Sequence, residues 1–394
     1  MNTQFKMVVA VLAALLIAVT GVGCSGSGSG ESTGDVAEPY RIGAVVSLTG
    51  TYAGLGTPEK NAIEMEMKRL NDAGGVNGRQ VEVIFEDDAT DPAKAQAAVA
   101  RLIEQEDVIA IIGATGTGQT MALRDDIDRA AIPQVSMAGG SVITAEFDEL
   151  VFQTPWPNRT VVPFTLRQLK ERGLTNVAVI SDTGGYGKDG HDIIVAQAAA
   201  AGVKIIADET FNPGDTDMMA QLTKIKSASP DVVLMWNAGK EAAIVAKNLK
   251  QLGMDVPLVG SPGNGRREFI EGAADAAEGF QFAAGKILVP EAYGVDTPAY
   301  DVATAFISDY TKAYDVAPDI FAGHAYDAFL VVTDALSRIE GDATPAALRD
   351  AIEQTSGLVG IGGTFTYGPQ DHNGLTEADL VFYRVEGNEW VLAK

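Results

Sequence analysis

The sequence predicts an α/β protein of two units, each a doubly wound and mostly parallel sheet flanked by helices. A chain of 394 residues is too long for one compact unit. From about residue 40, short apolar runs alternate with helical patterns, which is typical of parallel strands joined by helices. The alternation stops at the proline-rich stretch 154–158 and then starts again, which indicates the second unit.

The chain begins with the features of an exported protein. Lys6 precedes a thirteen-residue apolar run, Met7 to Val19, which is too short to span a bilayer but suits a signal peptide. The Gly-Val-Gly-Cys that follows resembles a bacterial lipobox. We therefore expect residues 1–23 to be a signal peptide, Cys24 to carry lipid and residues 24–39 to be a flexible linker. The protein would then be anchored outside the cytoplasm.

Charge and composition exclude several classes of partner. The net charge is −24, and loss of Lys6 would make it −24 − 1 = −25. Such a surface repels nucleic acid and disfavours highly phosphorylated ligands. The three histidines, His191, His324 and His372, are widely separated, and the one cysteine is expected to be lipidated. We therefore expect no metal site and no cofactor.

The elements of the first unit follow in order. Thr57 as N-cap and Pro58 at the first helical position predict a helix to about Ala73, and Asp91-Pro92 begins the next helix. A third helix is expected at 119–131. The apolar runs predict strands at 40–48, 81–86, 108–112, 133–136 and 151–153.

The second unit repeats this pattern before the chain turns to helices. We expect its helices at 188–201, 218–228 and 240–253. Its strands are expected at 176–181, 204–210, 232–236, 256–260 and 279–283. From about Gly285 the pattern predicts helices 298–314, 321–339 and 345–354, with short strands near 363–365 and 380–385. Helices without intervening strands cannot build a third sheet, so we expect them to cover the first two.

Small polar residues follow two strands in the segment 108–141. Because ligands bind at the carboxyl ends of parallel strands, Thr115, Thr117, Ala138 and Ser141 are candidates for the wall of an anion site. The alternative is a glycine turn that joins strand to helix and binds nothing. Gly113 to Thr120 is one residue from a nucleotide-binding P-loop, but Gln119 replaces the lysine that reaches the outer phosphates.

An enzyme is disfavoured. Gly185 to Gly190 spells G-x-G-x-x-G, and Asp208 and Glu209 follow near the spacing of a ribose-binding acid. However, residues 182–184 separate the motif from the predicted end of the strand, where a dinucleotide site needs a tight turn. The chain also has no G-x-S-x-G nucleophile elbow. We therefore assign no catalytic residues.

Three segments together resemble one known family. YRIGAVVSLTGTYAGLG, NDAGGVNGRQVEVIFEDDATDPAKA and IIGATGTGQT resemble the periplasmic leucine/isoleucine/valine-binding proteins, the type I solute-binding proteins of ABC importers. The resemblance implies two lobes joined by three hinge crossovers, with the ligand clamped between them. It places lobe 1 at 40–155 and 285–376, and lobe 2 at 156–284 and 377–394.

The resemblance also implies roles for particular residues. In the family a hydroxyl after the third strand holds the ligand carboxylate, and Thr117 falls at that position. Ala138 falls at a backbone contact, and Gly140 or Ser141 at a second hydroxyl. Tyr186 matches an aromatic residue of lobe 2 that closes over the ligand.

Three positions depart from the family pattern. Leu55 stands where a tyrosine is frequent, and Ala238 stands where another aromatic residue is found, directly after Trp236 and Asn237. Pro262 replaces the acid that pairs with the ammonium of the ligand. Without that acid, an ammonium in a dry cleft would be poorly paired, which is costly.

Two explanations of Pro262 are open. Glu241 or Asp182 could substitute for the missing acid. Otherwise the ligand is an acid or amide without an amine, and it could be aromatic. Trp156 and Trp236 are then candidate stacking surfaces, although each could equally be core.

The expected function follows from the resemblance. We expect a monomeric solute-binding lipoprotein that captures a small branched-chain-type amino acid, or a related carboxylate or amide, and delivers it to the membrane permease of an ABC importer. One alternative is a ligand-sensing receptor component with the same fold. Another is a binder of aromatic or short-chain organic acids.

Overall fold

The computed structural model describes residues 38–393. The predicted signal peptide, the lipidation of Cys24 and all but the last residues of the predicted linker lie outside this range. Within it, no helix is both long enough and apolar enough to cross a membrane.

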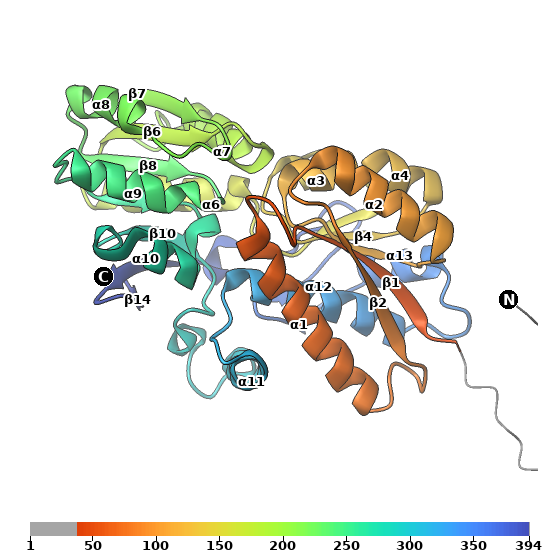
Figure 1. The fold of residues 1–394 in the computed structure, drawn as a ribbon. Helices are drawn as coiled ribbons and strands as arrows, with labels where there is room; N and C mark the ends of the chain where they lie inside the picture. The colour runs from red at the N-terminus through yellow and green to blue at the C-terminus, as the bar shows by residue number, and fades with distance from the viewer. Residues whose placement is uncertain (1–37, 394) are drawn as a thin grey trace, which may run out of the picture. The chain divides into compact units, whose positions relative to one another are not determined.

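The first sheet has five parallel strands in the order β2-β1-β3-β4-β5 (Figure 1). We call this sheet and the helices packed on it lobe 1. Its strands are β1 (Tyr40–Val46), β2 (Val81–Asp87), β3 (Ile111–Gly113), β4 (Gln134–Ser136) and β5 (Val151–Gln153). The helices between them are α1 (Ala53–Asp72), α2 (Pro92–Gln105), α3 (Thr117–Ala122), α4 (Arg124–Ala130) and α5 (Val142–Ala145).

Both faces of this sheet are buried, as its continuous apolar strands require. Along β1, Ala44 and Val46 belong to one apolar cluster, whereas Val45 between them packs with Leu102 of α2 and Ile127 of α4. Helix α1 covers the first face and lies beside α12 (Ile320–Ser337), which comes from far along the chain (Figure 1). The carboxyl ends of the strands are left for the site.

The second sheet has seven strands in the order β14-β13-β10-β9-β8-β6-β7, and we call it and its helices lobe 2. Strands β6 to β10 are parallel to one another, and β13 and β14 add an antiparallel edge beside β10. Its strands are β6 (Asn176–Asp182), β7 (Lys204–Phe211), β8 (Val232–Trp236), β9 (Leu258–Gly260), β10 (Gln281–Ala284), β13 (Val381–Glu386) and β14 (Glu389–Leu392).

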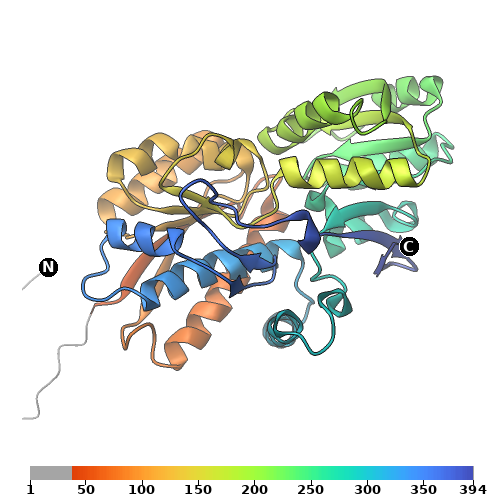
Figure 2. The same cartoon turned by 180° about the vertical axis from the view of Figure 1, so that it is seen from behind.

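Helices cover both faces of the second sheet as well. Figure 2 shows α6 in front of this sheet, on the face opposite α9. The helices are α6 (Asn158–Glu171), α7 (Gly185–Gln197), α8 (Met219–Ala228), α9 (Glu241–Gln251) and α10 (Arg267–Ala273).

Between β10 and β13 the chain returns to lobe 1, so it passes between the two sheets three times. The returning segment contains α11 (Pro298–Tyr314), α12, α13 (Pro345–Glu353) and the two-stranded ribbon of β11 (Leu358–Val359) and β12 (Thr364–Phe365). The predicted α/β class with two mostly parallel sheets is therefore confirmed. The exact lobe boundaries stay a prediction.

Several predicted element bounds are wrong. Helix α1 begins at Ala53, so Thr57 and Pro58 lie inside it. The Tyr52 carbonyl accepts the N–H groups of Leu55 and Gly56 at 2.8 and 3.0 Å, which closes a helical turn before Thr57 is reached. The side chain of Leu55 is buried, so packing against the lobe favours this earlier start.

Two further differences concern helices near the site. The helix predicted at 119–131 is two short helices, α3 and α4, that meet at Leu123. Because α3 has only six residues, it supplies less of a helix dipole than the continuous helix would. Helix α6 was not predicted at all, because Pro155 and Pro157 precede it and Pro163 lies within it.

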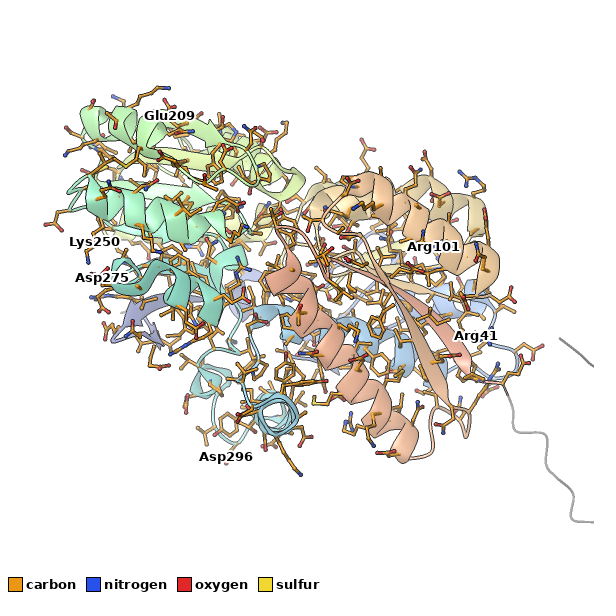
Figure 3. All side chains as sticks on the ribbon, in the orientation of Figure 1. Arg41, Arg101, Glu209, Lys250, Asp275 and Asp296 are labelled. Atoms are coloured by element: carbon orange, nitrogen blue, oxygen red, sulfur yellow. The ribbon has the colours of Figure 1, made fainter. Side chains whose placement is uncertain are left out.

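The outer surfaces of both lobes carry paired charges. Figure 3 labels Arg101 on lobe 1, where it pairs with Glu86, and Lys250 on lobe 2, where it pairs with Asp275. The hydrogen bond from Lys250 lowers the pKa of Asp275. These charges lie at the periphery of the two lobes, whereas the site described next is uncharged.

Candidate functional site

A cavity lies where the carboxyl ends of the lobe 1 strands face lobe 2. It contains about 450 Å³ of space between atoms, part of it open to solvent. Its lining residues are Tyr52, Leu55, Thr115, Gly116, Thr117, Met137, Ala138, Gly139, Pro155, Trp156, Tyr186, Ala238, Pro262, Gly263, Ile320, Phe321 and His324.

Thr117 is the first residue of α3 and has an unsatisfied hydroxyl. The residue is 2% exposed, and its Oγ1 has no hydrogen-bond partner among residues 38–393. A Cβ at Gly140 would lie 2.7 Å from this oxygen, so the chain approaches Thr117 closely there and only glycine fits. A buried hydroxyl without a partner costs stability, and a ligand with an acceptor atom would satisfy it.

Thr115 also lines the cavity, but its hydroxyl is already engaged. Its Oγ1 accepts the backbone N–H of Ser47 at 3.0 Å and shares a short hydrogen bond with the carboxyl of Glu59 on α1. Burial raises the pKa of Glu59 well above its usual range. The hydroxyl of Ser47 in turn donates to Asp88 at 2.6 Å, so a buried polar chain runs beneath this wall of the cavity.

Aromatic side chains form the wall between the lobes. Trp156 follows β5, and its indole Nε1 has no acceptor in the described part of the chain. Its ring meets that of His324 edge-on, with the ring centroids 5.2 Å apart. A side chain at Gly285 would overlap the Trp156 ring, so this glycine lets the indole lie against the backbone. Burial lowers the pKa of His324 to about 3, so the imidazole is neutral at physiological pH.

Lobe 2 contributes Tyr186, Ala238, Pro262 and Gly263. The Tyr186 ring approaches Gly139 of lobe 1, where a Cβ would lie 3.1 Å from Cε2 of the ring. Burial raises the pKa of Tyr186, so its hydroxyl stays protonated. These four residues give the lobe 2 wall one phenol and otherwise apolar or backbone groups.

No Asp, Glu, Lys or Arg occurs among the lining residues of this cavity within residues 38–393. The two acids considered as substitutes at Pro262 do not line it. Asp182 accepts the N–H of Gly184 at 2.7 Å, and burial raises its pKa to about 7. Glu241 accepts the N–H of Gly214 at 2.7 Å. One oxygen of each of these carboxyl groups therefore binds a loop of lobe 2.

Two residues predicted as ligand contacts lie elsewhere in lobe 2. Trp236 is fully buried in the core of the lobe and donates from Nε1 to Asn158 at 3.0 Å. The backbone carbonyl of Asn237 accepts the hydroxyl of Ser261 at 2.5 Å, and its side chain bonds Asn264 at 3.2 Å. Neither residue lines the cavity, because both hold the neighbouring loops together.

Gly140 and Ser141 also lie outside the cavity lining. The hydroxyl of Ser141 accepts the backbone N–H of Arg159 at 2.6 Å, and its own N–H donates to Asp189 of α7 at 2.7 Å. Ser141 therefore connects lobe 1 to lobe 2. Of the other predicted residues, Thr115, Thr117, Ala138, Trp156, Tyr186 and Pro262 do line the cavity.

Tyr52, Phe321 and His324 line the cavity but were not predicted. Phe321 and His324 lie in the first turns of α12, whose N-cap Asp319 accepts the N–H groups of Phe321 and Ala322 at 3.0 Å. The sequence shows the cap and the helix, but only the return of the chain to lobe 1 brings this helix end to the site.

The remaining motifs have structural roles. In the G-x-G-x-x-G segment, a Cβ at Gly187 would lie 2.5 Å from the Asp182 carbonyl, and a Cβ at Gly190 would overlap the Trp236 ring. His191 bonds Asp208 at 3.0 Å on the surface of lobe 2. Within residues 38–393, no three His, Cys, Asp or Glu side chains are placed to hold a metal ion.

Comparisons with known proteins agree with this architecture. A family model described as "Periplasmic binding protein" matches residues 39–389. The chain is 27% identical over 331 residues to Leu/Ile/Val-binding protein homolog 3 of Brucella melitensis, covering 83% of this chain and 86% of the relative. It is 28% identical to the leucine-, isoleucine-, valine-, threonine- and alanine-binding protein of Pseudomonas aeruginosa, covering 80% and 82%.

Solved structures show the same fold. An extracellular ligand-binding receptor from Rhodopseudomonas palustris HaA2 matches with a TM-score of 0.85 and 25% identity, covering 90% of this chain and 99% of the other. The branched-chain amino acid transporter substrate-binding protein LivJ of Streptococcus pneumoniae, in complex with isoleucine, matches with a TM-score of 0.77 and 25% identity, covering 90% and 100%. The resemblance seen in the sequence is confirmed, and the chain belongs to the periplasmic binding protein family, whose members bind solutes and are not enzymes.

Proposed function

We propose that this chain is the solute-binding component of an ABC importer and captures a small carboxylate or amide with an apolar body. The observation that carries the proposal is the two-lobed cavity, which is uncharged and contains the unpartnered hydroxyl of Thr117. Neutral donors can hold a carboxylate or an amide oxygen. The names of the relatives make branched-chain amino acids the first candidates.

The proposal also includes the partner of the protein and its location in the cell. A membrane permease would receive the solute, and a signal peptide at 1–23 with lipid on Cys24 would tether the monomer outside the cytoplasm. The strongly acidic surface supports a small-molecule role and not nucleic-acid binding.

Two ligands that differ only in the amine test the chemical class of the bound solute. We expect 3-methylpentanoate, which is isoleucine without its amine, to bind at least as tightly as L-isoleucine, because no acid among the described residues lines the cavity to pair with an ammonium. Isothermal titration of both compounds measures this directly. Isoleucine binding about tenfold tighter, a difference of about 1.4 kcal/mol, would show that an acid does pair with the amine. Tight binding of only a sugar, nucleotide or metal ion would refute the proposal itself.

A second prediction concerns lobe closure. A Cβ at Gly185 of lobe 2 would lie 2.8 Å from the backbone nitrogen of Gly118 in lobe 1. With this Cβ present, the lobes could not close fully. We therefore expect Gly185→Ala to weaken ligand binding about fivefold to tenfold, which corresponds to the lower range of overpacking costs. The unliganded protein can open and should keep its melting temperature.

Gly118→Ala is the matched control, because a Cβ there would meet only Cγ of Pro92 at 3.9 Å. This variant should bind as the wild type does. Small-angle scattering should show that ligand reduces the radius of gyration of the control but reduces it less in Gly185→Ala. Equal affinity of both variants would contradict closure at this contact.

A further inference from the structure

Glu59 and Asp88 form a buried acidic pair beneath the cavity wall. Both residues are 0% exposed, and Glu59 Oε1 and Asp88 Oδ2 have no hydrogen-bond partner within residues 38–393. The two carboxyl groups belong to one polar chain, in which Ser47 bonds both Asp88 and Thr115, and Thr115 bonds Glu59. Two ionised carboxylates in one buried chain, each with an oxygen that has no partner there, would be strongly unfavourable.

The charged groups that face Glu59 favour its protonated form. Asp88 after β2 and Asp319 at the start of α12 are the charged groups that act on it, and both are acids. Thr115 after β3 bonds Glu59 directly, and Ser47 after β1 reaches it through Thr115. Burial raises the pKa of Glu59 further, although its bond to Thr115 opposes this.

The protonation state of Glu59 decides the direction in which the hydrogen of the Thr115 hydroxyl points. An ionised Glu59 can only accept, so Thr115 must donate to it and has no hydrogen left for a ligand. A protonated Glu59 donates to Thr115 Oγ1, which can accept this bond together with that from the Ser47 N–H. The hydrogen of Thr115 is then free to point into the cavity that this residue lines.

We propose that Glu59 is a positioning residue, held protonated, which turns the Thr115 hydroxyl into a donor to the ligand. The proposal deepens, and rests on, the proposed function: the ligand carries an acceptor oxygen at Thr115 as well as at Thr117. Protonation also removes a negative charge that would repel a carboxylate in the cavity. The protein thus provides two hydroxyl donors on one wall and no charge.

The first test needs no ligand. In the unfolded chain Glu59 ionises near its usual pKa of ~4.3, whereas the folded protein keeps its proton. Wild type therefore binds about one more proton when folded, and its stability falls as pH rises from 5 to 8. Glu59→Gln, whose amide can donate to Thr115 in the same way, should bind about one proton fewer on folding than wild type. Its stability should therefore fall less steeply between pH 5 and 8. Identical pH slopes for wild type and Glu59→Gln would show that Glu59 is ionised and would overturn the proposal.

The second test uses 3-methylpentanoate and L-isoleucine as probes, after each variant has been shown to be folded. Thr115→Val should weaken binding at least about tenfold, the loss of one bond to a charged group, while Thr115→Ser stays within about threefold. Full affinity of a folded Thr115→Val would overturn the donor role. If neither probe binds wild type, the proposed ligand class fails, while the pH slopes still decide the state of Glu59.

Glu66→Gln is the control on the same helix. Glu66 is also buried, but it bonds Arg69 and does not line the cavity. Its replacement should leave the affinity for both probes unchanged. A loss of affinity equal to that of Thr115→Val would mean that the effect is a general one of disturbing α1, and would overturn the specific role.

Discussion

Replacing Asp327 with alanine is expected to lower the free energy of unfolding by about 2–6 kcal/mol, since each of two buried N–H groups left without an acceptor costs about 1–3 kcal/mol. Asp327 lies on α12 and is fully buried. Its two carboxylate oxygens accept the backbone N–H groups of Ile361 and Gly362 at 2.6 and 2.7 Å. Chemical denaturation followed by circular dichroism measures the loss.

This loss of stability should be specific to Asp327, whose side chain anchors the loop 360–363. Side chains at Gly360 or Gly362 would collide with the Asp327 carboxylate, so the loop 360–363 is shaped around that one acid. Asp334→Ala is the matched control on the same helix, because within residues 38–393 its carboxylate bonds only the partly exposed Arg338 at 3.0 Å. That change should cost within about 0.5 kcal/mol. Similar losses for both variants would show that Asp327 does not anchor the loop.

Local chemistry allowed some elements to be predicted closely. The helix predicted at 298–314 is α11, which begins at Pro298, and Thr297 caps it by accepting the N–H of Tyr300 at 3.2 Å. The helix predicted from 345 also begins there, and Thr344 caps it by accepting the N–H of Ala347. A cap signal failed at Thr57-Pro58, which lies inside α1, because tertiary packing of the preceding turn outweighs a local cap preference.

The lining of the cavity was predictable only where its residues follow a strand in an ordered series. Thr117 and Ala138 follow β3 and β4, so strand order alone brings them to one edge of the sheet. Phe321 and His324 reach the cavity from α12, through a return of the chain that no local pattern encodes. Trp236 illustrates the opposite error, since an aromatic residue at a strand end is equally suited to the core, and here Gly190 and Asn158 enclose it.

Replacing Thr117 with valine is expected to weaken binding of the preferred ligand by about 1.5–3 kcal/mol, or ~10- to 150-fold in Kd. Valine has the shape of threonine, so the close packing against Gly140 is kept and only the hydroxyl is lost. The unliganded protein should be as stable as wild type or slightly more stable, because the hydroxyl it loses is buried and has no partner within residues 38–393. A loss of affinity without a loss of stability separates a ligand contact from a structural role.

Thr117→Ser is the complementary control. Serine keeps the donor but removes the methyl group that meets Gly140, so it should retain most of the affinity while losing some stability. Isothermal titration and thermal unfolding of the two variants therefore give opposite patterns if Thr117 donates to the ligand. If Thr117→Val binds the ligand as tightly as wild type, the acceptor group of the ligand lies elsewhere in the cavity, and the segment from β3 to β4 serves only as scaffold.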